Sequence, residues 1–346
     1  MTSISTAALA AAPRLTVMQA QAALSRAQVE LSSGTLADIG LGLGGKTGSY
    51  VSLSGQQSRL QAIKDSNATT TATLTAANTA LDTLRTTATS FLASLTQSGS
   101  PGGSLATLVQ TASANLDGLT SALNTTVDGN AIFGGINSAA PPMTPYTATS
   151  AAKAQVDASF QNAFNTSQSS SDTAAITGSA MRSYLGGDFS SLFSSANYDT
   201  VWSTASDTVP TAQISASQTV QTSVSANGDA FRQLAQAYTM IQEFGGSSLG
   251  DDAKQAVIAS ATQLVSSALS GLTDAQAGIG LSQSAVSDAD DRMGTQIDYL
   301  SSQAQAMVAV DPSALSTQIS GLQTQIQASY EITSQLQQLS LVNYLK

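Results

Sequence analysis

The chain contains neither cysteine nor histidine. Thiolate zinc sites, thiol nucleophiles, histidine general bases and Ser–His–Asp triads are therefore all excluded. Pairs of Asp and Glu remain as acid–base candidates, but none accompanies a recognisable pocket signature. We accordingly predict no enzymatic activity, no metal site and no cofactor.

Charged residues are also scarce, at 10% of the chain against about a quarter in an average soluble domain. Only 12 of the 346 residues are basic, and the net charge is −10. The basic residues are scattered singly, so neither nucleic acid nor a membrane surface is a predicted partner. No apolar run approaches the roughly 18 residues that a spanning helix needs, so we predict no membrane insertion.

Long apolar stretches are missing at the N-terminus too. The segment from Ala7 to Ala12 faintly resembles a signal-peptide core, but no basic residue precedes it and it is only weakly hydrophobic. We predict that no signal peptide is cleaved. Ala, Ser, Thr, Gln and Gly dominate instead, and such small uncharged side chains suit repeated burial against copies of the same chain.

Helical heptad stripes are the strongest positive pattern, and one lies at each end of the chain. Apolar or small residues recur every three or four positions from Val17 to Leu31, in a helix predicted to begin at Pro13. A second stripe runs from Leu315 to Leu345 with one slip. Because such seams have to be covered by another helix, we predict a coiled-coil assembly interface. Its candidate residues are Val17, Leu24, Leu31, Leu315, Ile319, Leu322, Ile326, Leu336, Leu339, Leu341, Tyr344 and Leu345.

A longer seam lies inside the N-terminal half. Unbroken spacing of three and four from Leu60 to Leu95 predicts a helix with roughly 50 Å of apolar seam. The polar Asn67 and Thr70 within it are expected to lower stability and to help set the register. Another helix is predicted over about residues 104–126.

The C-terminal half repeats this pattern. Residues 251–307 predict one long helix, in which Gly278 and Gly280 mark a candidate kink. Asp311 and Pro312 then suit the N-cap and the first residue of the last helix.

The heptads vanish in the middle of the chain. There we predict helices over residues 151–164 and 172–185, and a strand or hairpin over 211–224. Trp202, the only tryptophan, is expected to anchor a small separate core.

These patterns predict a mainly α fold. A long-helix coiled-coil bundle is formed by the N- and C-terminal flanks, and a smaller mixed α/β domain is inserted into it. The predicted regions are a terminal coiled-coil assembly region at 1–47 and 309–346, a helical bundle at 48–137 and 228–308, and an inserted outer domain at 138–227.

Gly40, Gly45, Lys46 and Thr47 match the spacing of a phosphate-binding loop. That chemistry needs a buried strand before the loop and an acidic residue ending another strand. The preceding segment is instead helical, and no apolar run ends in Asp. We therefore interpret residues 34–48 as a glycine-rich linker between two helices.

Asp288, Asp290 and Asp291 form the densest acidic group. On a helix these side chains point in different directions, and the oxygen-rich loop that calcium prefers is missing. We interpret them as part of a solvated face.

Four segments resemble the flagellin superfamily, and within it the hook–filament junction proteins (hook-associated protein 3) of alphaproteobacteria. Glu30-Leu31-Ser32-Ser33-Gly34 closes the first helix as flagellins do. The remaining three are similar to the linker, the loop into the outer domain and the C-terminal end of junction proteins. They are Ala37–Leu41 with Gly45–Thr47, Asn130–Asn137, and Leu339–Leu345.

The resemblance implies a structural protein of the bacterial flagellum that is exported unfolded through the flagellar type III apparatus and works outside the cell. It implies termini that fold as coiled coils only in the assembly. Its implied partners are copies of itself, a hook-side junction protein, flagellin and an export chaperone.

Three alternatives remain at this point. The nearest is filament flagellin, which shares the fold but polymerises in far more copies. The others are a nucleotide enzyme built on the phosphate-loop string, and a surface adhesin or secreted coiled-coil effector.

Overall fold

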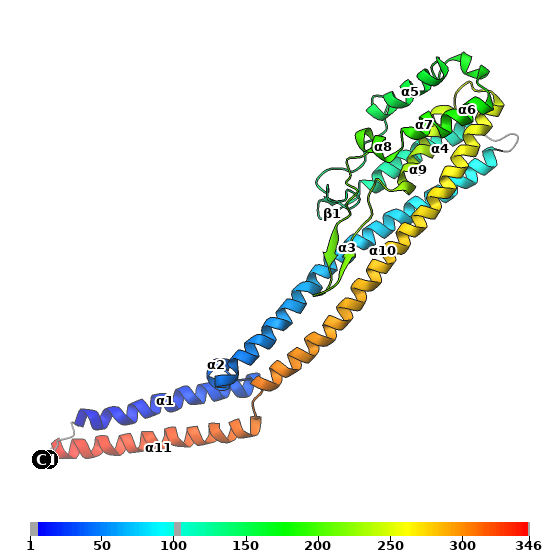
Figure 1. Cartoon of the computed structure of the whole chain (residues 1–346). Helices are drawn as coiled ribbons and strands as arrows, with labels where there is room; N and C mark the ends of the chain where they lie inside the picture. Colours follow the sequence, from blue (N-terminus) through cyan, green and yellow to red (C-terminus); the bar gives the residue numbers. More distant parts are fainter. Residues whose placement is uncertain (1–5, 100–104, 345–346) are drawn as a thin grey trace. The chain divides into compact units, whose positions relative to one another are not determined.

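The computed structural model describes residues 6–99 and 105–344, with side-chain environments for 14–99 and 105–335. Long helices form a bundle and β-structure is sparse, so the predicted fold class, mainly α with a small insertion, is confirmed. The chain forms two compact units (Figure 1). Unit 1 comprises residues 1–62 and 293–346, and unit 2 comprises residues 63–292.

Unit 1 brings the two ends of the sequence together. Thr35 and Ala309 pair in an antiparallel bridge, and the Leu36 N–H donates to the Val308 carbonyl at 2.9 Å. The elements of this unit are α1 (Thr6–Ser33), α2 (Ile39–Leu43), a 3₁₀ turn (Gly44–Lys46), the start of α3 (Thr47–Ser98), the end of α10 (Asp251–Val308) and α11 (Pro312–Tyr344).

Two predicted boundaries in this unit are wrong. The first helix begins at Thr6 rather than Pro13, because the preceding run of alanines has the highest helix propensity. The predicted linker over 34–48 is largely helical, since the Asp38 carboxylate accepts from the Leu41 N–H at 2.9 Å and caps α2.

The start of the last helix is confirmed. One carboxylate oxygen of Asp311 accepts from the Ser313 N–H at 2.8 Å, and Pro312 is the first residue of α11. The side chain thus satisfies a backbone donor that the helix itself leaves free.

Unit 2 contains the remainder of α3 and α10 and everything between them. α10 runs without a break through Gly278 and Gly280, so these glycines do not interrupt it. The intervening elements are α4 (Leu105–Leu123), β1 (Thr126–Val127), β2 (Asn130–Ala131), α5 (Ala151–Phe164), a 3₁₀ turn (Ser171–Ala175), α6 (Gly178–Gly186), α7 (Asp188–Ser191), α8 (Ser195–Val201), β3 (Thr211–Gln213), β4 (Thr219–Gln221) and α9 (Asp229–Phe244).

The middle of unit 2 follows the sequence prediction in part. The helix over 151–164 and the hairpin over 211–224 are confirmed, the latter as antiparallel β3 and β4. The prediction of a single helix over 172–185 is wrong. The chain instead forms a 3₁₀ turn and then α6, which begins where Thr177 caps the Ala180 N–H.

Aromatic side chains fill the core of this region. Trp202 is buried and stacks with Tyr146 on one side and Tyr198 on the other, at ring separations of 5.2 and 6.1 Å. Burial raises the pKa values of Tyr198 and Tyr238 above their ordinary range, because the charged form would lose its hydration.

α5 is held against α9 by a largely buried polar cluster. Glu243 accepts from the Tyr146 hydroxyl at 2.9 Å and pairs with Lys153 at 3.2 Å. Lys153 also pairs with Asp157 one turn along α5. Burial, reinforced by the Glu243 carboxylate, raises the pKa of Tyr146 well above its ordinary value. Lys153 therefore serves two carboxylates at once and links α5 to Glu243 of α9.

α10 is the one described helix with a segment long and apolar enough to cross a membrane by length and composition. Its apolar residues lie on the side that unit 2 buries, including Val257, Ala261 and Leu272. A core helix of this composition needs no bilayer to explain it.

Candidate assembly interface

The two helices that carry the predicted terminal seams, α1 and α11, lie side by side in unit 1 (Figure 1). Val17 and Leu315 are buried, and Leu31 is exposed. Leu24, Ile319, Leu322 and Ile326 are half-buried. The backbone of α11 is described through Tyr344, but the side chains of Leu336, Leu339, Leu341 and Tyr344 lie outside the described set, as does all of Leu345.

Packing between α1 and α11 relies on small residues. Ala20 and Ala27 join Val17 as the buried apolar residues described on α1, and Gln21 donates to the Tyr330 hydroxyl at 3.0 Å. Burying alanine removes little apolar area from water, so each contact contributes modestly. The described part of this helix pair thus leaves much of its surface uncovered.

A second seam runs along α1, and the sequence interpretation missed it. Leu15, Met18, Ala22, Ser25 and Val29 repeat the spacing of three and four, two residues out of phase with the first seam. At about 100° per residue, that offset places them on the far side of α1 from the first seam. Leu15, Met18 and Val29 are 58%, 66% and 51% exposed.

Exposed apolar side chains concentrate in unit 1. Among the described residues, nine of the eleven large exposed hydrophobic side chains belong to this unit. Exposed apolar surface of this kind is typical of interaction sites, so unit 1 is the candidate assembly region. The nine are Leu15, Met18, Val29, Leu31, Leu41, Val51, Tyr299, Tyr330 and Ile332.

Charge divides just as unevenly. The sequence of unit 1 contains five basic and five acidic residues and is neutral, whereas unit 2 contains seven basic and seventeen acidic residues. The whole net charge of −10 therefore lies in unit 2. Copies of unit 1 can pack together with no net like-charge repulsion.

The segment that follows α1 is fixed by its own polar groups. Gly34 adopts a left-handed φ of 70° and its N–H donates to the Glu30 carbonyl at 2.9 Å. The Glu30 carboxylate accepts from the Ala37 N–H at 3.2 Å. Glu30 and Gly34 thus turn the chain out of the terminal helix.

The phosphate-loop string has no phosphate-loop geometry. Gly40 lies in α2, Gly45 and Lys46 lie in the 3₁₀ turn, and Thr47 begins α3. The Thr47 hydroxyl donates to the Gly44 carbonyl at 2.7 Å. Helical segments stand where nucleotide binding requires a strand and an open cradle of N–H groups.

The loop that follows β2 is locked by close backbone packing. Gly135 has a φ of 62°, and a Cβ added there would lie 2.3 Å from the Ser206 carbonyl oxygen. Phe133 is buried and meets Phe231 edge to face at 6.1 Å. Both glycines of the Phe133–Gly135 motif are therefore dictated by packing, since a Cβ on Gly134 would lie 2.6 Å from the Asn137 oxygen.

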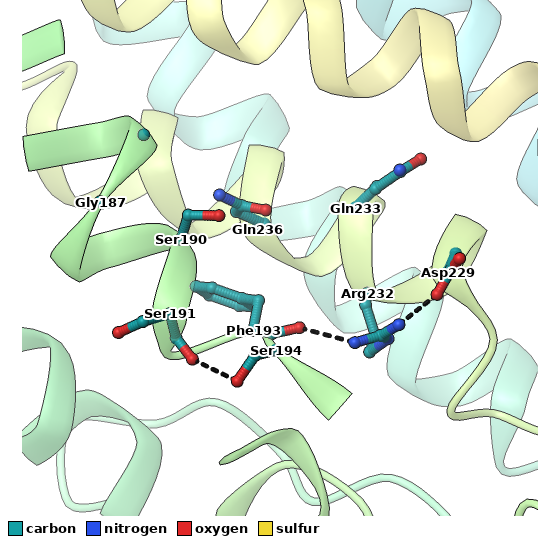
Figure 2. A pocket seen from close by; sticks show the side chains of 10 residues that line it. Gly187, Ser190, Ser191, Phe193, Ser194, Asp229, Arg232, Gln233 and Gln236 are labelled. Carbon is teal, nitrogen blue, oxygen red and sulfur yellow. Dashed lines mark hydrogen bonds and ion pairs between the residues drawn. The ribbon is translucent and has the colours of Figure 1, made fainter. Parts of the chain in front are cut away.

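A polar cleft lies in unit 2 beside α7 and the start of α9 (Figure 2). Arg232 donates to the Phe193 carbonyl at 3.1 Å and pairs with Asp229. The Ser194 hydroxyl donates to the Ser191 carbonyl at 2.7 Å. The charges that line the cleft are thus engaged with one another, and we assign no function to it.

These features describe a helical protein whose terminal helices keep apolar side chains exposed. A model of the bacterial flagellin N-terminal helical region matches residues 4–138, and one of the C-terminal helical region matches residues 262–345. Together they span well over half of the chain, which belongs to the flagellin family. This family is structural and non-enzymatic, and its members self-assemble into flagellar axial structures. The protein is accordingly a structural component of the bacterial flagellum that is assembled outside the cell.

The fold has a counterpart among solved structures. A structure from Vibrio parahaemolyticus, provisionally described as a flagellar hook-associated protein, matches with a TM-score of 0.54 at 11% identity. The match covers 76% of this chain and 97% of that chain. A search of curated proteins found no significant match.

Proposed function

We propose that this protein is the axial adaptor at the hook–filament junction, where a small number of copies join hook-side proteins to the flagellin filament. The observation that carries the proposal is the likeness to a hook-associated structure along 97% of that chain. The junction-like loop Asn130–Asn137 and the end Leu339–Leu345 support the same role.

Unit 1 supplies the contacts in this proposal. The first seam of α1 covers α11 within one copy, and the second seam, with Leu15 and Met18, meets a neighbouring copy. Such contacts are heterologous, since one patch meets a different patch on the next subunit and the stack continues. We retain residues 1–47 and 309–346 as the assembly region, 48–137 and 228–308 as the bundle, and 138–227 as the outward-facing insertion.

The apolar and neutral character of unit 1 fits export followed by assembly at the growing tip. In the proposal, the chain leaves the cell without a cleaved signal peptide, accompanied up to that point by an export chaperone. The apolar seams are then covered by neighbours, which offsets the entropy cost of ordering the terminal helices.

Deletion of the gene tests this role. We expect hooks without attached filaments, and flagellin released into the medium. The intact gene supplied in trans should restore attached filaments and end the release of flagellin. Cells that still assemble attached filaments would show that the junction role is wrong.

Filament flagellin is the second candidate, because both matched family models describe flagellin regions. Stoichiometry separates the two roles. An abundance comparable with that of the main filament protein in purified flagella would favour flagellin, whereas a few copies per flagellum would favour the adaptor.

A further inference from the structure

α3 and α10 meet at two points within unit 2. The Asn67 amide nitrogen lies 2.6 Å from one carboxylate oxygen of Asp290. Just after α3, a Cβ on Gly99 would lie 3.6 Å from the Ile258 Cγ2 atom. The two positions are separated by the same number of residues on each side, from 67 to 99 and from 258 to 290. A single antiparallel register therefore accounts for both meetings.

The seam between these points specifies that register weakly. Almost all the buried residues of α3 and α10 between these points are apolar, so a slip of seven residues would bring apolar side chains opposite apolar side chains. Such a slip would move α10 by about 10 Å along α3. The residues are Leu74, Ala77, Leu81, Leu84, Ala88, Phe91 and Leu95 on α3, and Ala261, Val265, Ala268, Leu272, Ile279, Val286 and Ala289 on α10.

Asn67 is the polar exception that does discriminate. Its side chain is fully buried, and its amide nitrogen donates both to Asp290 and to the Ile214 carbonyl at 3.1 Å. A slipped register would separate these groups and leave buried donors unpaired, which costs about 1–3 kcal/mol for each group. Its Oδ1 atom has no hydrogen-bond partner among the described residues, so the amide lowers stability compared with an apolar side chain.

The third partner comes from the β3–β4 hairpin, whose arrows reach the two long helices in Figure 1. Ile214 directly follows β3 and is fully buried, and its N–H donates to the Gln218 carbonyl at 2.9 Å. The Gln218 side chain in turn accepts from Arg292 of α10 at 3.3 Å. The hairpin tip therefore contacts both α3 and α10 through named polar groups.

We propose that Asn67, Asp290 and the tip of the β3–β4 hairpin form a register clasp. The clasp selects one heptad register of α3 against α10 out of several that the apolar seam would accept. Through it, a hairpin near the middle of the sequence controls how the long helices of unit 2 align. The proposal holds for the adaptor and for filament flagellin alike, because it concerns only the inside of one unit.

Spin-label distances test the clasp directly, since a chain without cysteine can be labelled at two chosen positions. Thr79→Cys on α3 and Ala277→Cys on α10 place labels at two exposed sites. Pulsed electron–electron double resonance should give one distance between the two labels in the parent chain. Asn67→Leu removes both hydrogen bonds and should add a second distance population, displaced in keeping with a shift of about 10 Å along the helices.

Two further variants keep the test decisive. Thr70→Val lies one turn along the same seam, and its hydroxyl donates only to the Ser66 carbonyl of its own helix, so a single distance is expected. Replacing residues 212–220 by a short Gly/Ser segment should add the second population, as Asn67→Leu does. A single unchanged distance in Asn67→Leu would overturn the clasp, and a single distance in the shortened hairpin would overturn the part assigned to the hairpin.

Discussion

The second seam of α1 leads to the most specific prediction about assembly. Leu15→Ser combined with Met18→Ser should weaken incorporation into the flagellum and leave the fold of the single chain intact. Both side chains are more than half exposed, so neither contributes much to the packing of α1 on α11.

The magnitude follows from the surface that remains to be buried. Full burial of a Leu or Met side chain contributes about 1.5–3 kcal/mol. Since 58% of Leu15 and 66% of Met18 is still exposed, covering the remainder contributes roughly 1–1.5 kcal/mol each. The double variant should therefore lose about 2–3 kcal/mol per contact, which weakens association roughly 30- to 150-fold.

Complementation of a deletion strain measures this effect. Immunoblots should show the variant exported in normal amounts but free in the medium, and electron microscopy should show mostly bare hooks. Leu281→Ser is the matched control, because Leu281 is 74% exposed on a helix of unit 2. Equal defects in the control and the double variant, or normal filaments in the double variant, would refute the second seam as an assembly surface.

Three further predictions concern packing, pH and salt. Gly135→Ala should destabilise unit 2 by roughly 1–3 kcal/mol through its positive φ, with more from the clash with Ser206; urea unfolding followed by Trp202 fluorescence measures this. The chain should lose stability above about pH 10, because burial raises the pKa of Tyr184 to about 12, whereas a tyrosine in the unfolded chain ionises near pH 10. Between these two values the free energy of unfolding should fall by about 1.4 kcal/mol per pH unit for each such group. Incorporation should change little between low and high salt, because unit 1 is neutral.

Each of these predictions has a control or a contrary result. Gly118→Ala changes an open position inside α4 and should stabilise by about 0.5–1 kcal/mol, so equal losses in the two glycine variants would contradict the packing argument. Unfolding free energies that stay level from about pH 9 to about pH 12 would contradict the burial of the tyrosines. Release of the protein from isolated flagella in about 1 M salt, where the Debye length falls to about 3 Å, would contradict a mainly apolar interface.

Periodicity made the long helices predictable because a seam of three and four needs no knowledge of its partner. The inner seam around Leu74 and Leu81 is buried as expected. The second seam of α1 has the same spacing in a different phase, but Ala22 and Ser25 in its middle weaken the hydrophobic signal.

Long-range polar contacts could not be predicted in this way. Asn67 was expected to set the register, but its partners Ile214 and Asp290 lie 147 and 223 residues away in sequence. Spacing within a single helix contains no information about such partners. The tight glycines near Gly135 were equally hidden, since their requirement comes from the Ser206 backbone rather than from neighbouring residues.

Immunogold labelling of isolated flagella tests the central claim most directly. An antibody against the exposed face of α5, whose sequence lies in the proposed outward-facing insertion, would report the position of the protein along the axis. The adaptor role predicts one band of gold between the hook and the filament. Gold along the whole filament, or none on any flagellum, would contradict that role.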